Sequence, residues 1–328
     1  MKAQKMKAIV CTKYGSPDFL QLKEVQKPTP KANEILIKVH ATTATAADTM
    51  MRKADPFISR FFMGFTKPQK DIIGTGFSGV IESIGEGVAD FKVGDSVFGE
   101  TGVNFGANAE YICMPEDGVV MIKPENISFE EAAPLCDGAL TSYNFLREVT
   151  RVKGGQKVLI NGASGSLGTA AVQIAKYYGA KVTGVCSASN FELVKSLGAD
   201  NLIDYRTSDF TENRETYDII YDTVGKLSFS KCKDSLTENG VYMSPVLDFG
   251  LLVQMGLTSI FGNKRAKFSA TGLRPAPELR KLLMELKKMI EFGKIKSVID
   301  RLYPLEQTAE AHRYVDTGRK RGNVIITI

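Results

Sequence analysis

The sequence predicts an α/β protein of two domains, one rich in β-strands and one built on a doubly wound parallel sheet. The chain has 328 residues, more than a single compact core usually contains. Up to about residue 126 it consists of β-type runs between turn-forming residues. From about residue 155 strands and helices alternate, which is typical of a parallel sheet with helices on both faces.

The N-terminal region is expected to form an antiparallel or barrel-like domain. Residues 34–41 (EILIKVHA) and 95–99 (DSVFG) are β-type runs. Turn-forming residues lie at the ends of such runs, for example at 27–30 and 85–87.

The C-terminal region has mixed character and is expected to rejoin the first domain. An amphipathic helix is predicted over 277–292, followed by β-type runs over 298–303 and 323–328. The predicted domains are therefore 1–126, completed by 266–328, and 127–265.

The middle region contains the alternating elements. A strand over 157–161 leads into a helix over 166–178, whose apolar residues recur at helical spacing and form one face. That face is expected to pack on the sheet. The other elements are predicted as a strand at 181–186, a helix at 190–197, and strands at 201–204, 217–222 and 240–244.

A glycine-rich turn joins the first strand of this region to its helix. Ala163, Gly165 and Gly168 follow the pattern A-x-G-x-x-G, and Ser166 and Leu167 begin the helix. In a dinucleotide site the first small residue tightens the turn, the second lets the backbone approach a pyrophosphate, and the third lets the helix lie near its strand. A purely structural turn is the alternative. The strand before and the helix after favour dinucleotide binding.

The end of the second strand bears on the choice between NAD and NADP. NAD-binding domains hold the ribose 2′-OH with an acid about 20 residues after the glycines, and this chain has Cys186 there. Nothing repels a 2′-phosphate, and Ser187, Ser189 and Asn190 are neutral donors. The missing acid favours NADPH. Residues 189–192 equally fit a helix capping box, in which the Ser189 hydroxyl would bond only to a backbone N–H group and not to a coenzyme.

The bulk composition excludes several partners. A net charge of +5 is too small to hold a nucleic acid at physiological salt.

The five cysteines include no C-x-x-C pair, which favours a reducing, cytoplasmic location. No apolar core of a signal peptide precedes Tyr14. The most apolar stretch, 249–261, is too short to span a membrane and is expected to be a buried or interface segment.

Several strings carry a family pattern, at 73–79, 91–95, 109–111, 140–143, 161–168, 196–200, 203–206 and 222–225. Over its whole length the chain resembles the zinc-independent quinone oxidoreductases of the medium-chain dehydrogenase/reductase superfamily, the zeta-crystallin-like type. The resemblance implies a GroES-like β-rich catalytic domain formed by both chain ends. It further implies a Rossmann domain between them and a cleft for the nicotinamide.

The same resemblance implies that no catalytic metal is bound. Zinc members would place a cysteine at Thr45, a histidine at Thr75 and typically a cysteine near Asp137. Catalytic zinc needs three protein ligands, and only one candidate remains. The two histidines, His40 and His312, lie in a strand-like and a helix-like run and are expected to be packed or surface residues.

The coenzyme contacts implied by the resemblance lie mostly in the middle domain. Gly165 to Gly168 would face the pyrophosphate, and Ser187 and Tyr205 the adenosine ribose and its phosphate. Thr141 would lie on the nicotinamide side. Further segments that line the coenzyme would contribute Val224, Ser244 and Ala270. Many relatives have a Lys or Arg near 189 or 191; here Arg206 or Arg319 would have to supply that cation, unless both are surface charges.

Without zinc, the expected reaction is hydride transfer from NADPH to a quinone or a similar electron-poor carbonyl, which delocalises the developing charge by itself. Thr45 and Asp48 are expected to bind the small-molecule substrate or order water, although Asp48 equally fits a helix cap. Residues 50–57 (MMRKADPF) lack the tyrosine of related enoyl reductases. The alternatives are an enone or enoyl reductase and a non-catalytic NADP-binding redox sensor. A homodimer is expected.

Overall fold

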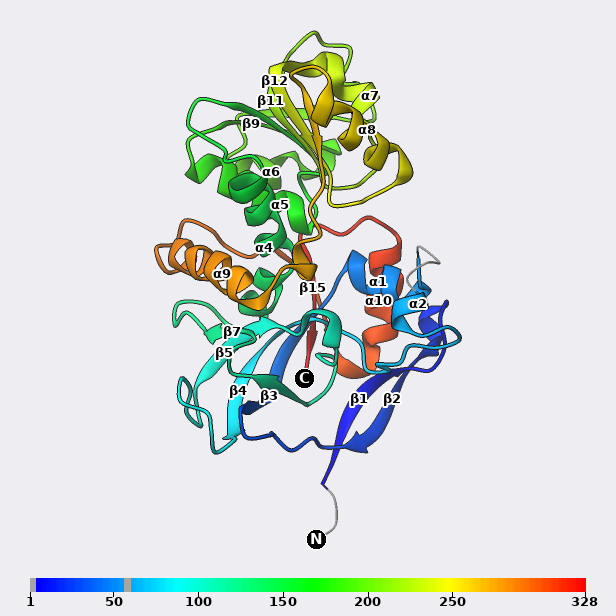
Figure 1. Ribbon diagram of the computed structural model, residues 1–328, viewed down its shortest axis with the longest axis vertical. Coiled ribbons are helices and arrows are strands. Elements are labelled where there is room, and N and C mark those ends of the chain that lie inside the picture. The colour runs from blue at the N-terminus through cyan, green and yellow to red at the C-terminus, as the bar shows by residue number, and fades with distance from the viewer. Residues whose placement is uncertain (1–3, 56–59) are drawn as a thin grey trace. The chain divides into compact units, whose positions relative to one another are not determined.

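The computed structural model describes residues 4–55 and 60–328, and the chain divides into two compact units (Figure 1). Unit 1 comprises Met1–Asp137, Gly272–Glu291 and Ser297–Ile328, and unit 2 comprises Gly138–Thr271 and Phe292–Lys296. A β-rich unit and a unit with a doubly wound parallel sheet confirm the predicted fold class. The predicted domain ranges themselves stay a prediction. Met1–Ala3 of the N-terminal segment and Pro56–Ser59, part of which belongs to the 50–57 loop, lie outside the described residues.

Unit 1 is organised around a seven-stranded sheet in the order β14-β15-β3-β4-β5-β7, with β6 also paired to β3. Both ends of the chain contribute, because β15 pairs antiparallel with β3 and parallel with β14. A separate hairpin is formed by β1 and β2. The strands are β1 (Lys5–Cys11), β2 (Leu20–Gln26), β3 (Glu34–Ala44), β4 (Gly76–Ile84), β5 (Ser96–Glu100), β6 (Tyr111–Pro115), β7 (Val119–Ile122), β14 (Ile299–Pro304) and β15 (Asn323–Thr327).

The core of unit 1 follows from the alternation along β3. Ile35, Ile37 and Val39 point to one face and are fully buried with Phe77 of β4 and Val97 of β5. The helices of this unit are α1 (Ala46–Lys53), α2 (Arg60–Met63), α3 (Phe129–Ala132), α9 (Ala276–Glu291) and α10 (Thr308–Asp316).

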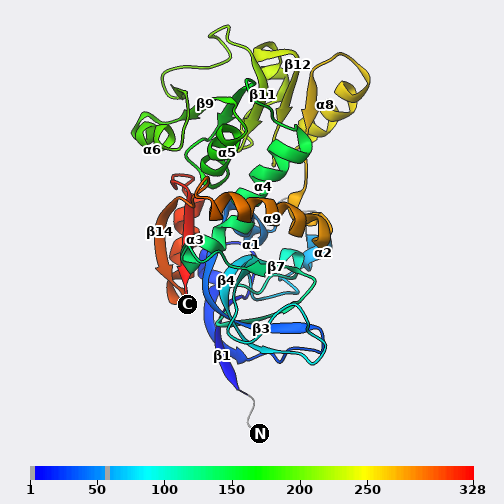
Figure 2. The ribbon, with the colours of Figure 1, turned by 90° about the vertical axis from the view of Figure 1, so that its left-hand side faces the viewer.

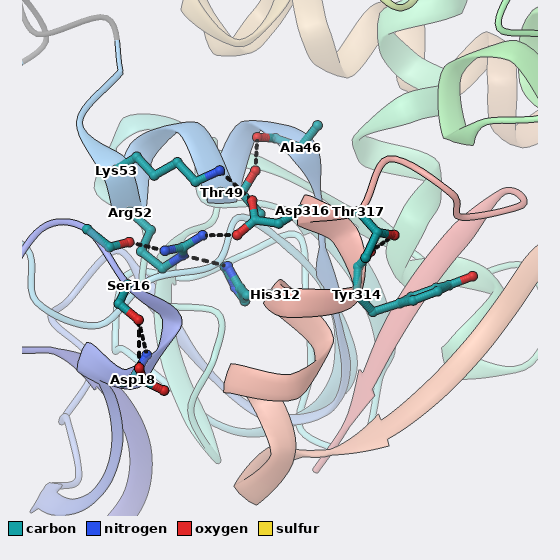
Figure 3. A network of polar contacts seen from close by, with 11 residues as sticks. Ser16, Asp18, Ala46, Thr49, Arg52, Lys53, His312, Tyr314, Asp316 and Thr317 are labelled. Atoms are coloured by element: carbon teal, nitrogen blue, oxygen red, sulfur yellow. Dashed lines mark hydrogen bonds and ion pairs between the residues drawn. The ribbon is translucent and has the colours of Figure 1, made fainter.

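A buried polar network joins α1 to α10 (Figure 3). The Arg52 side chain is fully buried and donates to Asp316 Oδ2 at 2.5 Å, to the Gly15 carbonyl, and to His312 Nδ1 at 3.4 Å. Lys53 reaches the other oxygen of Asp316 at 2.6 Å. His312 is therefore a packed residue, as predicted, and Arg52 links segments from both ends of the chain.

His312 gives unit 1 a testable sensitivity to acid. Burial, and then the neighbouring charge of Arg52, lower the pKa of His312 to about 3, while Asp316 opposes and Lys53 reinforces the shift. A lowered folded-state pKa means that stability present above the unfolded value of about 6.5 is lost as pH falls toward 3. We expect the free energy of unfolding to fall by up to about 1.4 kcal/mol per pH unit in this range.

Urea denaturation between about pH 6.5 and 5 checks this expectation, with His312→Asn as the comparison. The variant lacks the titrating imidazole, so its stability should decline less steeply with falling pH than that of the wild type. Equal slopes for the two proteins would contradict the assignment.

Unit 2 has a six-stranded parallel sheet in the order β10-β9-β8-β11-β12-β13. The chain proceeds outward from β8 in one direction and then from β11 in the other, so a topological switch point lies between β8 and β11. The strands are β8 (Lys157–Asn161), β9 (Lys181–Cys186), β10 (Asn201–Asp204), β11 (Tyr217–Asp222), β12 (Leu236–Met243) and β13 (Arg265–Lys267).

Helices flank this sheet, among them α5, α6 and α8 (Figure 2). Helix α6 contacts β10, and α8 contacts β13. Leu159 and Ile220 of the central strands are fully buried. The helices are α4 (Gly138–Tyr143), α5 (Ser166–Tyr177), α6 (Phe191–Ser196), α7 (Phe229–Cys232) and α8 (Phe249–Ile260).

Helix α8 occupies the apolar stretch that was expected to be buried or to form an interface. Its buried side chains are Leu251 and Thr258 alone. Phe249 is 81% and Ile260 74% exposed, and the following Phe261 is 69% exposed. The expectation of a buried segment is thus wrong, because the sheet contacts one narrow side of the helix. None of the helices in the described residues is long and apolar enough to cross a membrane.

Candidate active site

The glycine-rich turn follows β8 at the switch point of the unit 2 sheet. Gly162 has φ +80°, a left-handed conformation that favours glycine, and the N–H groups of Gly162 and Ala163 both donate to the Val185 carbonyl at 3.0 Å. Ala163 is fully buried, so it positions the turn against β9. Gly165 is the N-cap of α5 and offers no side-chain cap to the helix. The helix N-terminus is therefore open to an anion.

Two glycines of the turn have different physical roles. A Cβ on Gly168 would lie 2.1 Å from the Gly162 carbonyl oxygen and 2.6 Å from Ala163 Cα. Gly168 is thus required for close packing of α5 on the turn. A Cβ on Gly165 would meet nothing closer than 3.5 Å, so the space beside its backbone is open. The residues present therefore fit the pyrophosphate of a dinucleotide at Gly165.

Neutral polar side chains gather at the end of β9. Ser187 and Ser189 share a hydroxyl–hydroxyl hydrogen bond of 3.1 Å, and Asn190 donates to Ser164 of the glycine-rich turn at 2.9 Å. Asn190 Oδ1 is buried without a partner. Asn190 is the N-cap of α6 and makes no side-chain cap, so the capping-box alternative for residues 189–192 is wrong. Cys186 itself is buried, 2% exposed.

The strand β10 brings Tyr205 to the same loop. Asp204 accepts from the Ala188 N–H at 3.1 Å and from the Arg206 N–H at 3.0 Å, so its carboxylate fastens two loops together. Tyr205 is 61% exposed beside this junction. The structure thus brings Ser187 and Ser189 together and places Tyr205 next to the aspartate that is bonded to their loop.

Other candidate residues lie at or near the carboxyl edge of the sheet. Val224 follows β11 and is 44% exposed, whereas Ser244 follows β12 and is buried, accepting from the Val246 N–H. Thr141 lies in α4, and Ala270 follows β13. Their contacts with a coenzyme stay predictions.

Sequence reasoning missed Asp222, a fully buried carboxylate at the end of β11. It accepts from Asn161 at 2.8 Å and from the N–H groups of Val224 and Leu227 at 3.1 and 2.8 Å. Asp222 therefore holds the loop after β11 in place. The available signal was an acid at a strand end followed by Thr-Val-Gly.

In unit 1, Thr45 and Asp48 form a capping box at the start of α1. Asp48 N–H donates to Thr45 Oγ1 at 3.0 Å, while the Thr45 N–H and hydroxyl donate to Asp48 Oδ2 at 2.9 and 2.7 Å. The helix-cap interpretation of Asp48 is therefore correct. Asp48 is 1% exposed, and burial together with the nearby Asp137 raises its pKa to about 7.

Two of the positions expected to hold zinc ligands in zinc-dependent members, Thr75 and Asp137, form a hydroxyl–carboxylate cluster with Thr43. Thr75 donates to Asp137 Oδ1 at 3.2 Å and Thr43 to Asp137 Oδ2 at 2.5 Å. Within the described part of the chain, no group of three His, Cys, Asp or Glu side chains is arranged to hold a metal ion. His40 stacks on Phe129 with ring centroids 4.5 Å apart. The residues present do not fit a catalytic zinc.

Comparisons with known proteins agree with this architecture. The alcohol dehydrogenase GroES-like domain family matches residues 31–124, and a family described as zinc-binding dehydrogenase matches 197–326. The 2-methylene-furan-3-one reductase of Solanum lycopersicum is 32% identical over 98% of this chain and 79% of its own. The structure of the Coxiella burnetii quinone oxidoreductase is 29% identical, with a TM-score of 0.88 over 99% of this chain and 100% of that one.

A further solved structure is that of the Escherichia coli quinone oxidoreductase complexed with NADPH. It is 26% identical, with a TM-score of 0.83 over 99% of both chains. A GroES-like domain combined with a Rossmann domain defines the class of medium-chain dehydrogenases/reductases. This chain belongs to that family, within the quinone oxidoreductase type, and is an oxidoreductase. The predicted family and enzyme class are confirmed.

Proposed function

We propose that this protein is an NADPH-dependent oxidoreductase that transfers a hydride to a quinone or a similar electron-poor carbonyl without a metal. The observation that carries the proposal is the open space at Gly165, next to the hydroxyl groups of Ser187 and Ser189 and with Cys186, in place of an acid, at the end of β9. The NADPH complex of the Escherichia coli relative supports the choice of coenzyme.

The coenzyme would supply the hydride, and the residues of unit 2 would bind and orient it. Gly165, Ser166, Leu167 and Gly168 would hold the pyrophosphate at the N-terminus of α5. Ser187, Ser189 and Tyr205 would surround the ribose and its 2′-phosphate. The remaining proposed contacts are Ala163, which shapes the turn, Thr141 on the nicotinamide side, and Val224, Ser244 and Ala270 on segments that line the coenzyme.

The proposed acceptor follows from the chemistry that unit 1 offers. Hydroxyl groups and a single carboxylate occupy the positions where a metal would polarise a carbonyl. An acceptor that spreads the incoming charge by itself needs only positioning and hydrogen bonds. Thr45 would provide these, with the buried Asp48 acting through the Thr45 hydroxyl. The Solanum lycopersicum relative favours a conjugated enone as the second candidate substrate.

The decisive experiment measures NADPH oxidation by the purified protein with 1,4-benzoquinone, 9,10-phenanthrenequinone and a simple conjugated enone. We expect turnover with the quinones, unchanged by a chelator. Faster turnover of the enone would favour the second candidate. NADPH binding without oxidation by any acceptor would overturn the enzymatic proposal in favour of a redox sensor.

We expect Cys186→Asp to shift the coenzyme preference from NADPH toward NADH. A carboxylate at this position would accept from the ribose 2′-OH and repel a 2′-phosphate, whose charge approaches two at neutral pH. Ratios of kcat/KM for the two coenzymes with one quinone measure the effect. Cys186→Ser is the matched control, because it changes the same buried position without adding charge. An NADH preference in the wild type would contradict the argument.

We also propose a homodimer that covers the exposed apolar side of α8. Phe249, Leu257 and Ile260 are 81%, 49% and 74% exposed, and the helix carries no charged residue. Exposed apolar surface of this kind marks interaction sites. The adjacent β13 is an edge strand with β12 as its one neighbour in the sheet. Two copies could pair such edges symmetrically.

Ile260→Asp is expected to weaken or abolish the dimer while leaving the fold intact, because its side chain is mostly exposed. Sedimentation of the wild type and the variant measures the change in mass. Leu302→Asp, at a 56% exposed position on β14, controls for adding a charge to an exposed apolar site. A monomeric wild type would contradict the proposal.

A reducing location, such as the cytoplasm, is proposed on the state of the cysteines. All five are free thiols in the structure, and four of them are buried. Disulfide bonds are common in oxidising compartments and rare in reducing ones.

A further inference from the structure

A row of polar groups crosses three strands at one end of the unit 1 sheet. On one side of β4, Gly76 lies opposite Glu100 of β5. On the other side β4 pairs antiparallel with β3, where Phe77 lies opposite Thr42. The next residue of β3, Thr43, therefore lies beside Gly76. A Cβ on Gly76 would lie 2.5 Å from Asp137 Oδ2 and 3.1 Å from Thr43 Oγ1. The Asp137 carboxylate therefore fills the place of a Gly76 side chain, between Thr43 and Glu100.

Two carboxyl groups of this region are buried without full hydrogen bonding. Glu100 is 7% exposed and its Oε1 has no partner. Asp48, at the start of α1, is 1% exposed and its Oδ1 has no partner. Asp137 differs, because hydroxyl groups donate to both of its oxygens. An ionised carboxylate that lacks donors is costly to bury, whereas a protonated one is not.

The charges that face this cluster do not balance three carboxylates. Lys320, from the loop before β15, is the cation that acts on Asp137, and it donates to the Gly322 carbonyl at 2.9 Å. Cys136 is the other titratable neighbour, and burial keeps its thiol neutral by raising its pKa. Asp300 acts on Lys320 in turn, and Arg52 and Lys70 line a small cavity beside Asp48, with Arg52 already paired to Asp316. Complete ionisation would therefore leave more negative than positive charge in a buried region, which a protein interior avoids by retaining protons.

The pKa shifts of these groups all favour the neutral form. Burial, with Asp137 as the second cause, raises the pKa of Glu100 to about 8 and that of Asp48 to about 7. Burial also raises the pKa of Asp137, against the hydroxyl groups of Thr43 and Thr75. Burial lowers the pKa of Lys320 to about 8, against the attraction of Asp137 and Asp300.

We propose that Asp48, Glu100 and Asp137 form a proton store, and that Asp48 passes one stored proton through the Thr45 hydroxyl to the reduced acceptor in each turnover. The inference deepens the proposed function and rests on it. Thr45 is partly exposed and its hydroxyl lies 2.7 Å from Asp48 Oδ2, so it connects the buried acid to the surface of unit 1.

The step balances in atoms and electrons. Hydride transfer adds two electrons and one hydrogen to the quinone and leaves a hydroquinone monoanion. The anion takes the Thr45 hydroxyl proton, Thr45 takes the carboxyl proton of Asp48, and Asp48 becomes a carboxylate. A proton from water then restores the acid. Asp48 borders a cavity of about 10 Å³, also lined by Arg52 and Lys70, which has room for about one water molecule.

The first test uses the coenzyme-free protein. Infrared spectra at about pH 6 and about pH 9.5 should differ by loss of protonated-carboxyl bands, because both groups titrate between these values. Asp48→Asn and Glu100→Gln should each remove one band. Asp55→Asn, at an exposed position, should remove none. Absence of any protonated carboxyl band in the wild type at the lower pH would overturn the store.

The second test uses turnover with a quinone. Asp48→Asn should lower kcat by about 100-fold, the scale of lost general acid catalysis, and remove the alkaline decline of the pH profile. NADPH affinity, measured by fluorescence, should stay unchanged. Thr45→Ala should also lower kcat, and Thr45→Ser should restore it, since serine keeps both the hydroxyl group and the cap.

The two proposals fail in different ways. A wild type that does not oxidise NADPH with any acceptor refutes the proposed function, whatever the infrared spectra show. A wild type that turns over while Asp48→Asn and Thr45→Ala keep the wild-type kcat and pH profile refutes the proton transfer alone. If Asp48→Asn does not fold, the comparison of Thr45→Ala with Thr45→Ser still tests the proton transfer.

Discussion

Gly165→Asp is expected to fold like the wild type and to lose NADPH affinity by about 100-fold or more, since like charges placed together cost several kcal/mol. A carboxylate at this position would occupy the open space beside the backbone, at the N-terminus of α5. Gly165→Ala is the uncharged counterpart. It should keep the stability of the wild type and weaken binding by filling the space that the pyrophosphate needs.

Gly168→Val should lower the stability of the fold as well as NADPH binding. Its first side-chain atom would lie 2.1 Å from the Gly162 carbonyl oxygen, which is backbone and cannot rotate away. We expect a loss of stability at or above the upper end of the about 1–3 kcal/mol usual for overpacking. NADPH binding should disappear with it, because α5 and the turn separate.

NADPH fluorescence titration and thermal unfolding together separate the two glycines. For Gly165→Asp we expect the melting temperature of the wild type with NADPH binding lost, and for Gly165→Ala the same melting temperature with binding weakened. For Gly168→Val we expect a lowered melting temperature together with lost binding. Unchanged affinity in a folded Gly165→Asp protein would remove this turn from the coenzyme site.

Arg52→Met is expected to lower the free energy of unfolding by about 3–5 kcal/mol, the usual cost of removing one partner of a buried ion pair. Its side chain is fully buried, and its loss leaves Asp316 Oδ2, the Gly15 carbonyl and His312 Nδ1 without this donor, while Lys53 still pairs with Asp316 Oδ1. The stem of methionine fills much of the same volume. The loss is thus electrostatic in origin and not a cavity effect.

Lys53→Met provides the matched control, because Lys53 pairs with the same Asp316 from a 44% exposed position. An exposed pair contributes about 0–1 kcal/mol, so this variant should be nearly as stable as the wild type. Urea denaturation of both variants measures the difference. Equal, small losses would show that burial of Arg52 adds nothing.

The parts of the fold that sequence alone could predict are those with local signals. The glycine-rich turn and the strands over 157–161, 181–186, 201–204 and 217–222 match the structure, because turn chemistry and apolar runs lie within a few residues. β3 was expected to end at Ala41 but continues to Ala44. Its last residues pair with β15, almost 300 positions away, and no local pattern reveals such a partner.

The candidate site divides in the same way. Thr45 and Asp48 could be identified from a spacing typical of a helix cap. Glu100 and Lys320 could not, because their significance comes from burial beside Asp137, which depends on packing between distant segments. Ser189 shows the opposite error: its capping-box spacing was present, but its hydroxyl pairs with Ser187 instead.

The pairing of β3 with β15 has a consequence for synthesis on the ribosome. Residues 138–271 are contiguous and can complete their parallel sheet while the rest of the chain is still being made. The N-terminal strands must wait, because β15 at Asn323–Thr327 emerges only after the whole of that contiguous segment. Until then the end of β3 presents unpaired backbone groups, a template for association between nascent chains. A chaperone that binds early should therefore protect residues 41–44, and a circular permutant that begins at β15 should depend on it less.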